Sequence, residues 1–256
     1  MDLGLRNRAV LVTGGSSNIG AATAVAFGRE GARVALTYRS RKDAAEKVAE
    51  DIRANGGEAY TTQFDLEDLD AGPRLVEEVV QHWDGLDVLV NNAVRWADTN
   101  PTERISAFEK DTSDWRVQID ANVTGTLQVL KAAMPALKAS GSGRIVNLST
   151  SLVERGMVGA VPYTAAKAAL LGATRTIAWE GGRDGLIANV VMPGWVIDGK
   201  DLPFEIPQAM MDEQTGRLPT GALPSSVHVA DAIVFLCSQV NKSITGEVIR
   251  VTGGTS

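Results

Sequence analysis

The feature that most constrains the fold is an alternation of short apolar runs with longer helical stretches along the whole chain. The short runs are dominated by Val, Ile and Leu, without the polar alternation of a half-exposed strand. This pattern is expected for strands buried on both faces of a parallel sheet. The runs are Ala9–Thr13, Arg33–Tyr38, Ala59–Phe64, Val88–Asn91, Arg144–Leu148, Ile187–Met192 and Val248–Val251.

The stretches between these runs have helical features, such as alanine-rich composition or apolar residues at helical spacing. They are Ile19–Arg29, Arg41–Ala54, Leu69–Trp83, Thr112–Ala139, Tyr163–Trp179 and Val227–Ser238. Strands that alternate with helices in this way predict an α/β fold. We expect a single domain over residues 1–256, with a doubly wound parallel sheet of about seven strands and helices on both faces.

Two segments, Val94–Ser113 and Gly194–Ser226, have no regular pattern, and the second is rich in proline. A long irregular segment in a compact domain is often a lid or binding loop. We therefore expect the region of about 194–226 to contact substrate. The alternative is a surface insertion with no role in binding.

Composition excludes several classes of function. The 256 residues include 25 Lys+Arg against 31 Asp+Glu, with no basic run, so nucleic acid is not an expected partner. One cysteine and two isolated histidines cannot build a common zinc site, so no metal is expected. No apolar run reaches the roughly 20 residues of a membrane span, and the first residues do not form a signal peptide. We expect a cytoplasmic protein that does not bind membranes.

A glycine-rich turn, Thr13–Gly20, follows the first predicted strand and leads directly into a helix. Glycines allow the backbone to approach a diphosphate closely, and the helix amino end carries unpaired N–H groups. The turn therefore predicts a dinucleotide site; the alternative is a tight turn without a ligand. The candidate binding residues are Gly14, Ser16, Ser17, Asn18, Ile19 and Gly20.

Tyr163 and Lys167 lie four residues apart at the start of a predicted helix, which places both side chains on one face. A lysine ammonium near a phenol favours the phenolate and lowers the tyrosine pKa. A tyrosine of this kind can donate a proton to a carbonyl or accept one from an alcohol.

With these motifs the chain resembles the short-chain dehydrogenase/reductase family, in particular ketoreductases similar to 3-oxoacyl-carrier-protein reductases. The resemblance spans nearly the whole chain and implies a Rossmann-type fold. It depends on landmarks that occur in the family's order: Thr13–Gly20, Asp65-Leu66, Asn91-Asn92-Ala93, Asn122, Tyr163 with Lys167, and Pro193-Gly194.

The resemblance implies a catalytic group. Tyr163 is the general acid/base, and Lys167 holds the nicotinamide ribose and tunes Tyr163. Asn122 holds a water that links Lys167 to solvent. The family's catalytic serine lies thirteen residues before the tyrosine, where this chain has Thr150. The alternative is that neighbouring Ser149 or Ser151 supplies the hydroxyl.

The resemblance also implies cofactor contacts. Asp65 is expected to hydrogen-bond to the adenine, with Leu66 beside it. Asn91 and Ala93 are expected to contact the adenosine ribose. The backbone of Pro193, Gly194 and Val196 is expected to meet the carboxamide.

The second strand ends in Tyr38, Arg39 and Ser40, where an NAD site usually has an acidic residue. Guanidinium and hydroxyl groups suit a 2′-phosphate, so we expect NADP(H) in preference to NAD(H). The alternative is a solvated basic start of the next helix.

Three residues depart from the family pattern. Asn18 stands at a usual glycine, and Asn tolerates left-handed backbone better than other side chains. Val94 replaces the glycine after Asn-Asn-Ala, where it either crowds the cofactor or packs. Asp198 replaces a threonine, and we expect its carboxylate to point away from the diphosphate.

These features predict NADPH-dependent reduction of a ketone or 3-oxoacyl group, free or carrier-bound, to a secondary alcohol. Trp96 and Trp195 are candidates to touch that substrate. A non-catalytic dinucleotide sensor and a hydratase, epimerase or dehalogenase on the same scaffold are alternatives. The resemblance also implies a homotetramer, and the small residues of Thr112–Ala139 and Tyr163–Trp179 suit helix contacts across a symmetric interface.

Overall fold

The computed structural model describes residues 1–96, 105–109, 111–198 and 206–255. Its sheet has seven parallel strands in the order β3-β2-β1-β4-β5-β6-β7, which confirms the predicted α/β fold. The strands are β1 (Ala9–Val12), β2 (Arg33–Tyr38), β3 (Glu58–Gln63), β4 (Val88–Asn91), β5 (Arg144–Leu148), β6 (Ile187–Pro193) and β7 (Val248–Val251).

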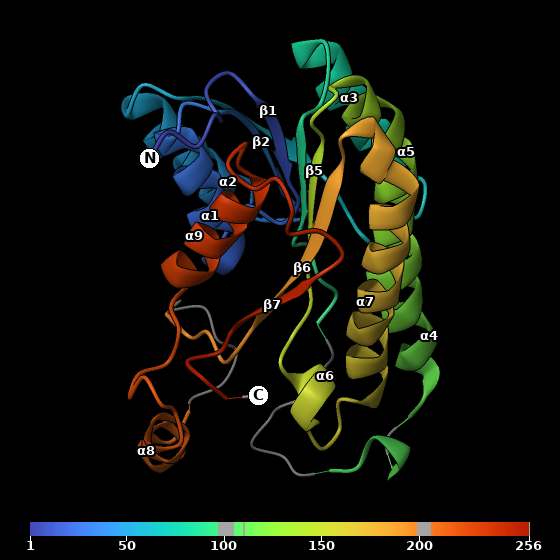
Figure 1. Ribbon diagram of the computed structural model, residues 1–256. Coiled ribbons are helices and arrows are strands. Elements are labelled where there is room, and N and C mark those ends of the chain that lie inside the picture. Colours follow the sequence, from blue (N-terminus) through green and yellow to red (C-terminus); the bar gives the residue numbers. More distant parts are fainter. Residues whose placement is uncertain (97–104, 110, 199–205, 256) are drawn as a thin grey trace.

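Helices cover both faces of the sheet. Figure 1 shows α1, α2 and α9 on one side and α3, α5 and α7 on the other. The helices are α1 (Asn18–Arg29), α2 (Lys42–Ala54), α3 (Ala71–Trp83), α4 (Ser113–Ile119), α5 (Thr126–Ala139), α6 (Leu152–Arg155), α7 (Val161–Gly181), α8 (Gln208–Gly216) and α9 (Ser226–Cys237). In the described part of the chain, no helix is long and apolar enough to cross a membrane.

The predicted helix over Thr112–Ala139 is interrupted. Between α4 and α5 the chain makes a π-helical turn, η2 (Asp120–Gly125), which contains Asn122. Such turns insert one extra residue into a helix and are frequent at functional sites. The prediction of one continuous helix over Thr112–Ala139 did not include this turn.

Two short helices lie in segments without a sequence pattern. α6 follows β5 directly, and α8 lies within the predicted loop region of about 194–226. Residues 97–104, 110 and 199–205 of the two irregular segments lie outside the described residues.

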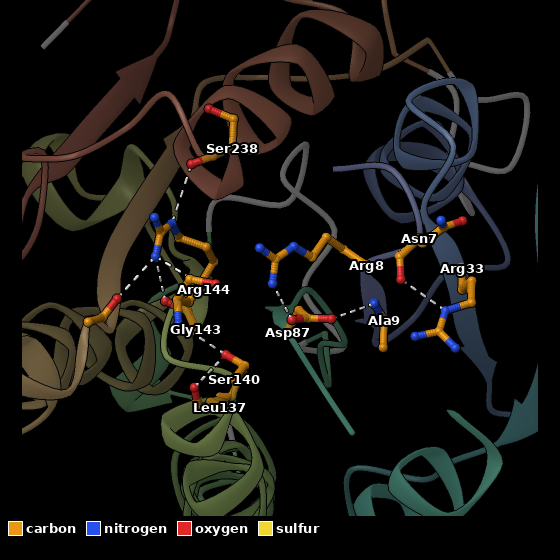
Figure 2. A network of polar contacts seen from close by, with 12 residues as sticks. Asn7, Arg8, Ala9, Arg33, Asp87, Leu137, Ser140, Gly143, Arg144 and Ser238 are labelled. Carbon is orange, nitrogen blue, oxygen red and sulfur yellow. Dashed lines mark hydrogen bonds and ion pairs between the residues drawn. The ribbon is translucent and has the colours of Figure 1, made fainter. Parts of the chain in front are cut away.

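A network of polar contacts joins the amino ends of the strands (Figure 2). The Asp87 carboxylate accepts from Arg8 Nη1 at 2.7 Å and from the Ala9 amide at 2.8 Å, which ties β4 to β1. Arg144, the first residue of β5, is only 3% exposed. Its guanidinium donates to the carbonyl oxygens of Ser142, Gly143, Gly185, Ser238 and Asn241.

The strand order reverses direction between β1 and β4, because β1 is followed by β2 on one side and later by β4 on the other. In doubly wound sheets, ligands bind at the carboxyl ends of the strands beside such a point. The landmarks found in the sequence follow the carboxyl ends of β1, β3, β4, β5 and β6.

Candidate active site

A cavity of about 1100 Å³ opens at the carboxyl ends of the strands. Most of the residues selected from the sequence line it, although they come from segments far apart in the chain. Those that do are Gly14, Ser16, Ser17, Asn18, Ile19, Arg39, Ser40, Asp65, Leu66, Ala93, Thr150, Tyr163, Lys167, Pro193, Gly194 and Val196. Those that do not are Gly20, Tyr38, Asn91 and Asn122.

The turn between β1 and α1 has the backbone needed to receive a diphosphate. Gly14 has a φ of +67°, and Asn18 has a φ of +46°, so asparagine occupies the left-handed conformation expected of it. A Cβ on Gly20 would lie 2.2 Å from the Gly14 carbonyl oxygen, which excludes any side chain there. Ser17 makes no side-chain capping bond within the described chain, so its helix end is compatible with an anion.

Asn92, which we did not select, fixes this turn. Its Nδ2 donates to the carbonyl oxygens of Thr13 at 2.9 Å and Gly14 at 3.0 Å. The expected ribose contact of the Asn91 side chain is not supported, because that side chain lies in the interior and donates to Asn147 Oδ1 at 2.8 Å. Successive residues of a strand point to opposite faces of the sheet. Asn91 therefore points into the interior, whereas Asn92, one position later, points to the cavity side.

In the loops after β2 and β3, Arg39 pairs with Glu67 at 3.2 Å. Glu67 also pairs with Arg95, at 3.0 Å. Asp65 accepts a hydrogen bond from the Glu67 amide, which fixes the loop after β3. Tyr38 packs against the core beneath α1 and α2 instead of lining the cavity.

Three of the four predicted catalytic residues, Thr150, Tyr163 and Lys167, line the cavity together. Tyr163 and Lys167 lie in the first turns of α7 and are 5% and 3% exposed. The Thr150 side chain lies close enough to the Tyr163 phenol to lower the pKa of that group. Ser149 Oγ instead donates to the Lys167 carbonyl at 3.0 Å. The assignment of the hydroxyl role to Thr150 stays a prediction.

Burial determines the charges in this group. It raises the pKa of Tyr163 well above its usual value, and the hydrogen bond from Thr150 offsets part of that rise. This direction is opposite to the one expected from the Tyr163–Lys167 spacing. Burial lowers the pKa of Lys167 to about 8. The Lys167 ammonium donates to the Leu148 carbonyl at 2.9 Å.

Asn122 lies behind this group, in the π-helical turn. Its side chain accepts from the Arg95 amide at 3.0 Å and donates to the Arg95 carbonyl at 2.9 Å. It therefore fixes the loop that carries Trp96, whose ring centroid lies 4.6 Å from that of Tyr163. The predicted water relay through Asn122 remains a prediction.

The two other departures from the family pattern have clear positions. Asp198 is exposed, and its carboxylate accepts from the Ser226 amide and hydroxyl, each at 2.6 Å, at the start of α9. It faces that helix, as expected of a group that has to avoid a diphosphate. Val94 lines the cavity and is 43% exposed, so it is not packed in the core.

The other half of the cavity has a lining that the sequence indicated only in part. Trp96 and Trp195 lie there, as expected of substrate-contacting residues. The residues contributed by α6, α8 and the loop before α7 were not selected. They are Arg155, Met157, Met210, Glu213, Gln214 and Arg217. Among the described residues, no group of three His, Cys, Asp or Glu side chains could hold a metal ion.

This fold and cavity define a class: an oxidoreductase that binds a nicotinamide dinucleotide. Comparison with known proteins gives the family. The family model described as enoyl-(acyl carrier protein) reductase matches residues 14–256. The chain belongs to the short-chain dehydrogenase/reductase family and is an NAD(P)-dependent short-chain oxidoreductase.

Similar proteins extend over almost the full chain. The 3-oxoacyl-[acyl-carrier-protein] reductase of Staphylococcus epidermidis is 32% identical over 97% of this chain and 98% of its own. A (3R)-3-hydroxyacyl-CoA dehydrogenase from Canis lupus familiaris is 36% identical over 98% of this chain and 97% of its own. A short chain dehydrogenase from Burkholderia cenocepacia, solved in complex with NADP, has a TM-score of 0.87 and 32% identity, covering 98% of each chain.

Proposed function

We propose that the protein reduces a ketone or 3-oxoacyl group to a secondary alcohol with NADPH, and that Tyr163 is the proton donor. The observation that carries this proposal is that Thr150, Tyr163 and Lys167 line the same cavity as the glycine-rich turn, Trp96 and Trp195. A carbonyl oxygen placed beside Thr150 and Tyr163 can accept from the hydroxyls of both.

The residues present fit a dinucleotide. A Cβ on Gly14 would lie 3.0 Å from the Ala93 Cα, so the turn packs too closely against Ala93 for a side chain at this position. Without that side chain, the backbone of the turn is also open to a ligand. Residues Ser16–Ile19 would hold the diphosphate, and Asp65 and Ala93 the adenosine. When bound, the reduced nicotinamide supplies the hydride that the carbonyl carbon accepts.

The chain's own residues supply the rest of the chemistry. The carbonyl oxygen gains negative charge as its carbon takes the hydride, and the Thr150 hydroxyl stabilises that charge. Tyr163 then gives its proton to the oxygen, which completes the alcohol and leaves a phenolate. The ammonium of Lys167, one turn along α7, favours that phenolate until solvent restores the proton. Because the pKa of Tyr163 is raised, the residue holds its proton at neutral pH, as a donor must.

Arg39 supports the preference for NADPH. Its guanidinium lines the cavity beside Ser40 and is paired with Glu67 at an exposed position. Exposed pairs of this kind contribute at most about 1 kcal/mol, so a 2′-phosphate with a double charge can displace the carboxylate.

The substrate class follows from the relatives by similarity. The named relatives act on 3-oxoacyl or 3-hydroxyacyl groups bound to acyl carrier protein or CoA. We propose that the carbonyl here is a 3-oxoacyl thioester or a smaller ketone, free or carrier-bound. A non-catalytic sensor would not need the buried Tyr163–Lys167 pair.

Absorbance of the reduced nicotinamide, followed with a panel of ketones and 3-oxoacyl thioesters, tests this function. We expect cofactor oxidation with at least one carbonyl, and a higher kcat/KM with NADPH than with NADH. Arg39→Ser should reduce that preference. Binding of NADPH without turnover across the panel would favour the sensor. Conversion of substrate without net change of cofactor would favour a hydratase, epimerase or dehalogenase.

We also propose a cytoplasmic homotetramer. Exposed apolar residues on α4, α5 and α7 support association through the predicted helices: Val117, Leu127 and Trp179 are 38%, 39% and 84% exposed. Burying them against a second copy removes this apolar surface from water. Light scattering at micromolar concentration tests the assembly, and a monomer would refute it.

A further inference from the structure

Arg155 differs from the other charged residues of the cavity. The other arginines there are engaged: Arg39 with Glu67, Arg95 with Glu67 and Asp114, and Arg217 with Glu213, while Arg41 also has an interaction. The Arg155 guanidinium has no hydrogen-bond or ion-pair partner within the described residues.

The carboxylates in reach are already used. Glu213 lines the cavity and is paired with Arg217 at 2.6 Å. Glu154, the neighbour of Arg155 in α6, makes several contacts with Arg250 of β7. The substrate half therefore holds one positive charge that no described protein group neutralises.

The backbone holds Arg155 in a fixed place. Its amide donates to the Ser151 carbonyl at 3.2 Å, and the Ser151 amide donates to the Pro193 carbonyl at 2.9 Å. The Glu154–Arg250 pair attaches the same helix to the edge of the sheet. Although Arg155 as a residue is exposed, protein atoms cover part of its guanidinium, and this burial lowers its pKa. A guanidinium that has lost part of its hydration shell is stabilised by an anion bound in place of that water.

We propose that Arg155 binds an anionic group of the substrate, so that the enzyme selects carbonyl compounds that carry a carboxylate or a phosphate ester. This inference rests on the proposed function, because it places the reacting carbonyl at Thr150 and Tyr163. Arg155 follows Thr150 by five residues and lines the same cavity as Thr150 and Tyr163. The chain between them is folded compactly, because the Val153 amide donates to the Thr150 carbonyl and the Arg155 amide to the Ser151 carbonyl. A guanidinium suits both kinds of oxyanion.

The first test compares matched substrates. A series of 3-, 4- and 5-oxo acids is assayed beside the corresponding methyl esters, and 3-oxobutyl phosphate beside 4-hydroxy-2-butanone. The first pairs differ in a carboxylate, and the last pair differs in a phosphate. We expect wild-type kcat/KM to favour the anion by about tenfold to hundredfold in at least one pair, as for hydrogen bonds to charged groups.

The variants Arg155→Gln and Arg155→Lys identify the residue responsible. We expect Arg155→Gln to lose the preference, mainly through a higher KM for the anionic substrates, and Arg155→Lys to keep part of it. Arg183→Gln, which removes an exposed arginine outside the cavity, is the matched control. The substrate pair whose kcat/KM ratio changes in Arg155→Gln shows whether Arg155 binds a carboxylate or a phosphate. Equal losses on anionic and neutral substrates, or no preference in any pair, would overturn the proposal.

A second test does not depend on turnover. Calorimetry measures binding of 3-hydroxybutyrate, its methyl ester and CoA to wild type and Arg155→Gln in the presence of NADP. Tighter binding of an anion to wild type than to the variant supports the role of Arg155 even if no carbonyl on the panel is reduced. Equal affinities of the two proteins for all three ligands would refute it, whatever the outcome for carbonyl reduction.

Discussion

The amino ends and the carboxyl ends of the strands satisfy their polar groups in different ways. At the amino ends, buried Arg144 donates to carbonyl oxygens from several loops, and Asp87 binds both Arg8 and the Ala9 amide (Figure 2). At the carboxyl ends, the protein leaves a cavity and, in the described chain, an arginine without a partner. Closed networks stabilise a fold, whereas open polar groups are available to ligands.

The largest expected effect comes from Tyr163→Phe at the carboxyl ends. Loss of a general acid lowers rates by about 10²–10⁴-fold, so kcat for ketone reduction should fall by that amount. The affinity for NADPH should stay nearly constant, because the phenol acts on the carbonyl. Steady-state assays and NADPH fluorescence titration measure the two quantities.

Tyr60→Phe is the matched control for this change. Its hydroxyl is buried without a hydrogen-bond partner among the described residues, far from the cavity lining. The same atom is removed in both variants, yet we expect Tyr60→Phe to keep its activity. Near-normal turnover in Tyr163→Phe would exclude the mechanism.

The next effect is that of Thr150→Val, which removes the hydroxyl beside Tyr163. Loss of one donor to a developing oxyanion costs about 10²–10³-fold in kcat. Ser149→Ala removes a bond to the Lys167 carbonyl instead, and Ser151→Ala completes the set. With saturating NADPH we expect the threonine variant alone to lose kcat on this scale. If it keeps kcat while a serine variant loses it, the assignment is wrong.

At the amino ends the expected effect is on stability. Arg144→Met would remove the guanidinium donor from the carbonyl oxygens of the buried residues Ser238 and Asn241, which should lower the free energy of unfolding by about 2–4 kcal/mol. The kcat of the folded fraction should not change, because the cavity lies at the opposite ends of the strands. Urea unfolding at one fixed protein concentration measures the shift. A loss of kcat without a loss of stability would contradict this division of the molecule.

Sequence reasoning predicted the strands to within one residue, and most of the predicted cofactor residues line one cavity. It succeeded where local chemistry decides the outcome, as with the left-handed Asn18 and the glycine at position 20. It failed where the outcome depends on packing between distant segments. The raised pKa of Tyr163 comes from burial, and the engagement of Arg39 by Glu67 comes from a loop after another strand.

The same limit explains the other differences. Asn91 and Asn92 are the same residue type at adjacent positions, so only the strand's orientation decides which one faces the cavity. The region of about 194–226 was expected to contact substrate, but not to form the helix α8. The cavity position of Arg155 arises in a segment without periodicity and could not be derived before the structure.

The smallest expected effect is a pH dependence centred on Lys167. Because burial lowers its pKa to about 8, the ammonium that supports Tyr163 loses its proton above that pH. In the reducing direction, kcat/KM should therefore be level below about pH 8 and fall about tenfold per unit above it. Lys167→Arg, which stays charged, should move the fall to higher pH; an unchanged profile would assign it to another group.

The stability contribution of Lys167 should change in the opposite sense. Between its folded pKa of about 8 and the ordinary value of 10.5, the unfolded chain binds more protons at this residue than the folded protein does. The free energy of unfolding contributed by Lys167 therefore rises with pH across that window, while activity falls. Comparing urea unfolding of wild type and Lys167→Met at pH 7.5 and 9.5 isolates this term. Wild type should gain stability relative to the variant at the higher pH. A relative gain by the variant would contradict a lowered pKa of Lys167 in the folded protein.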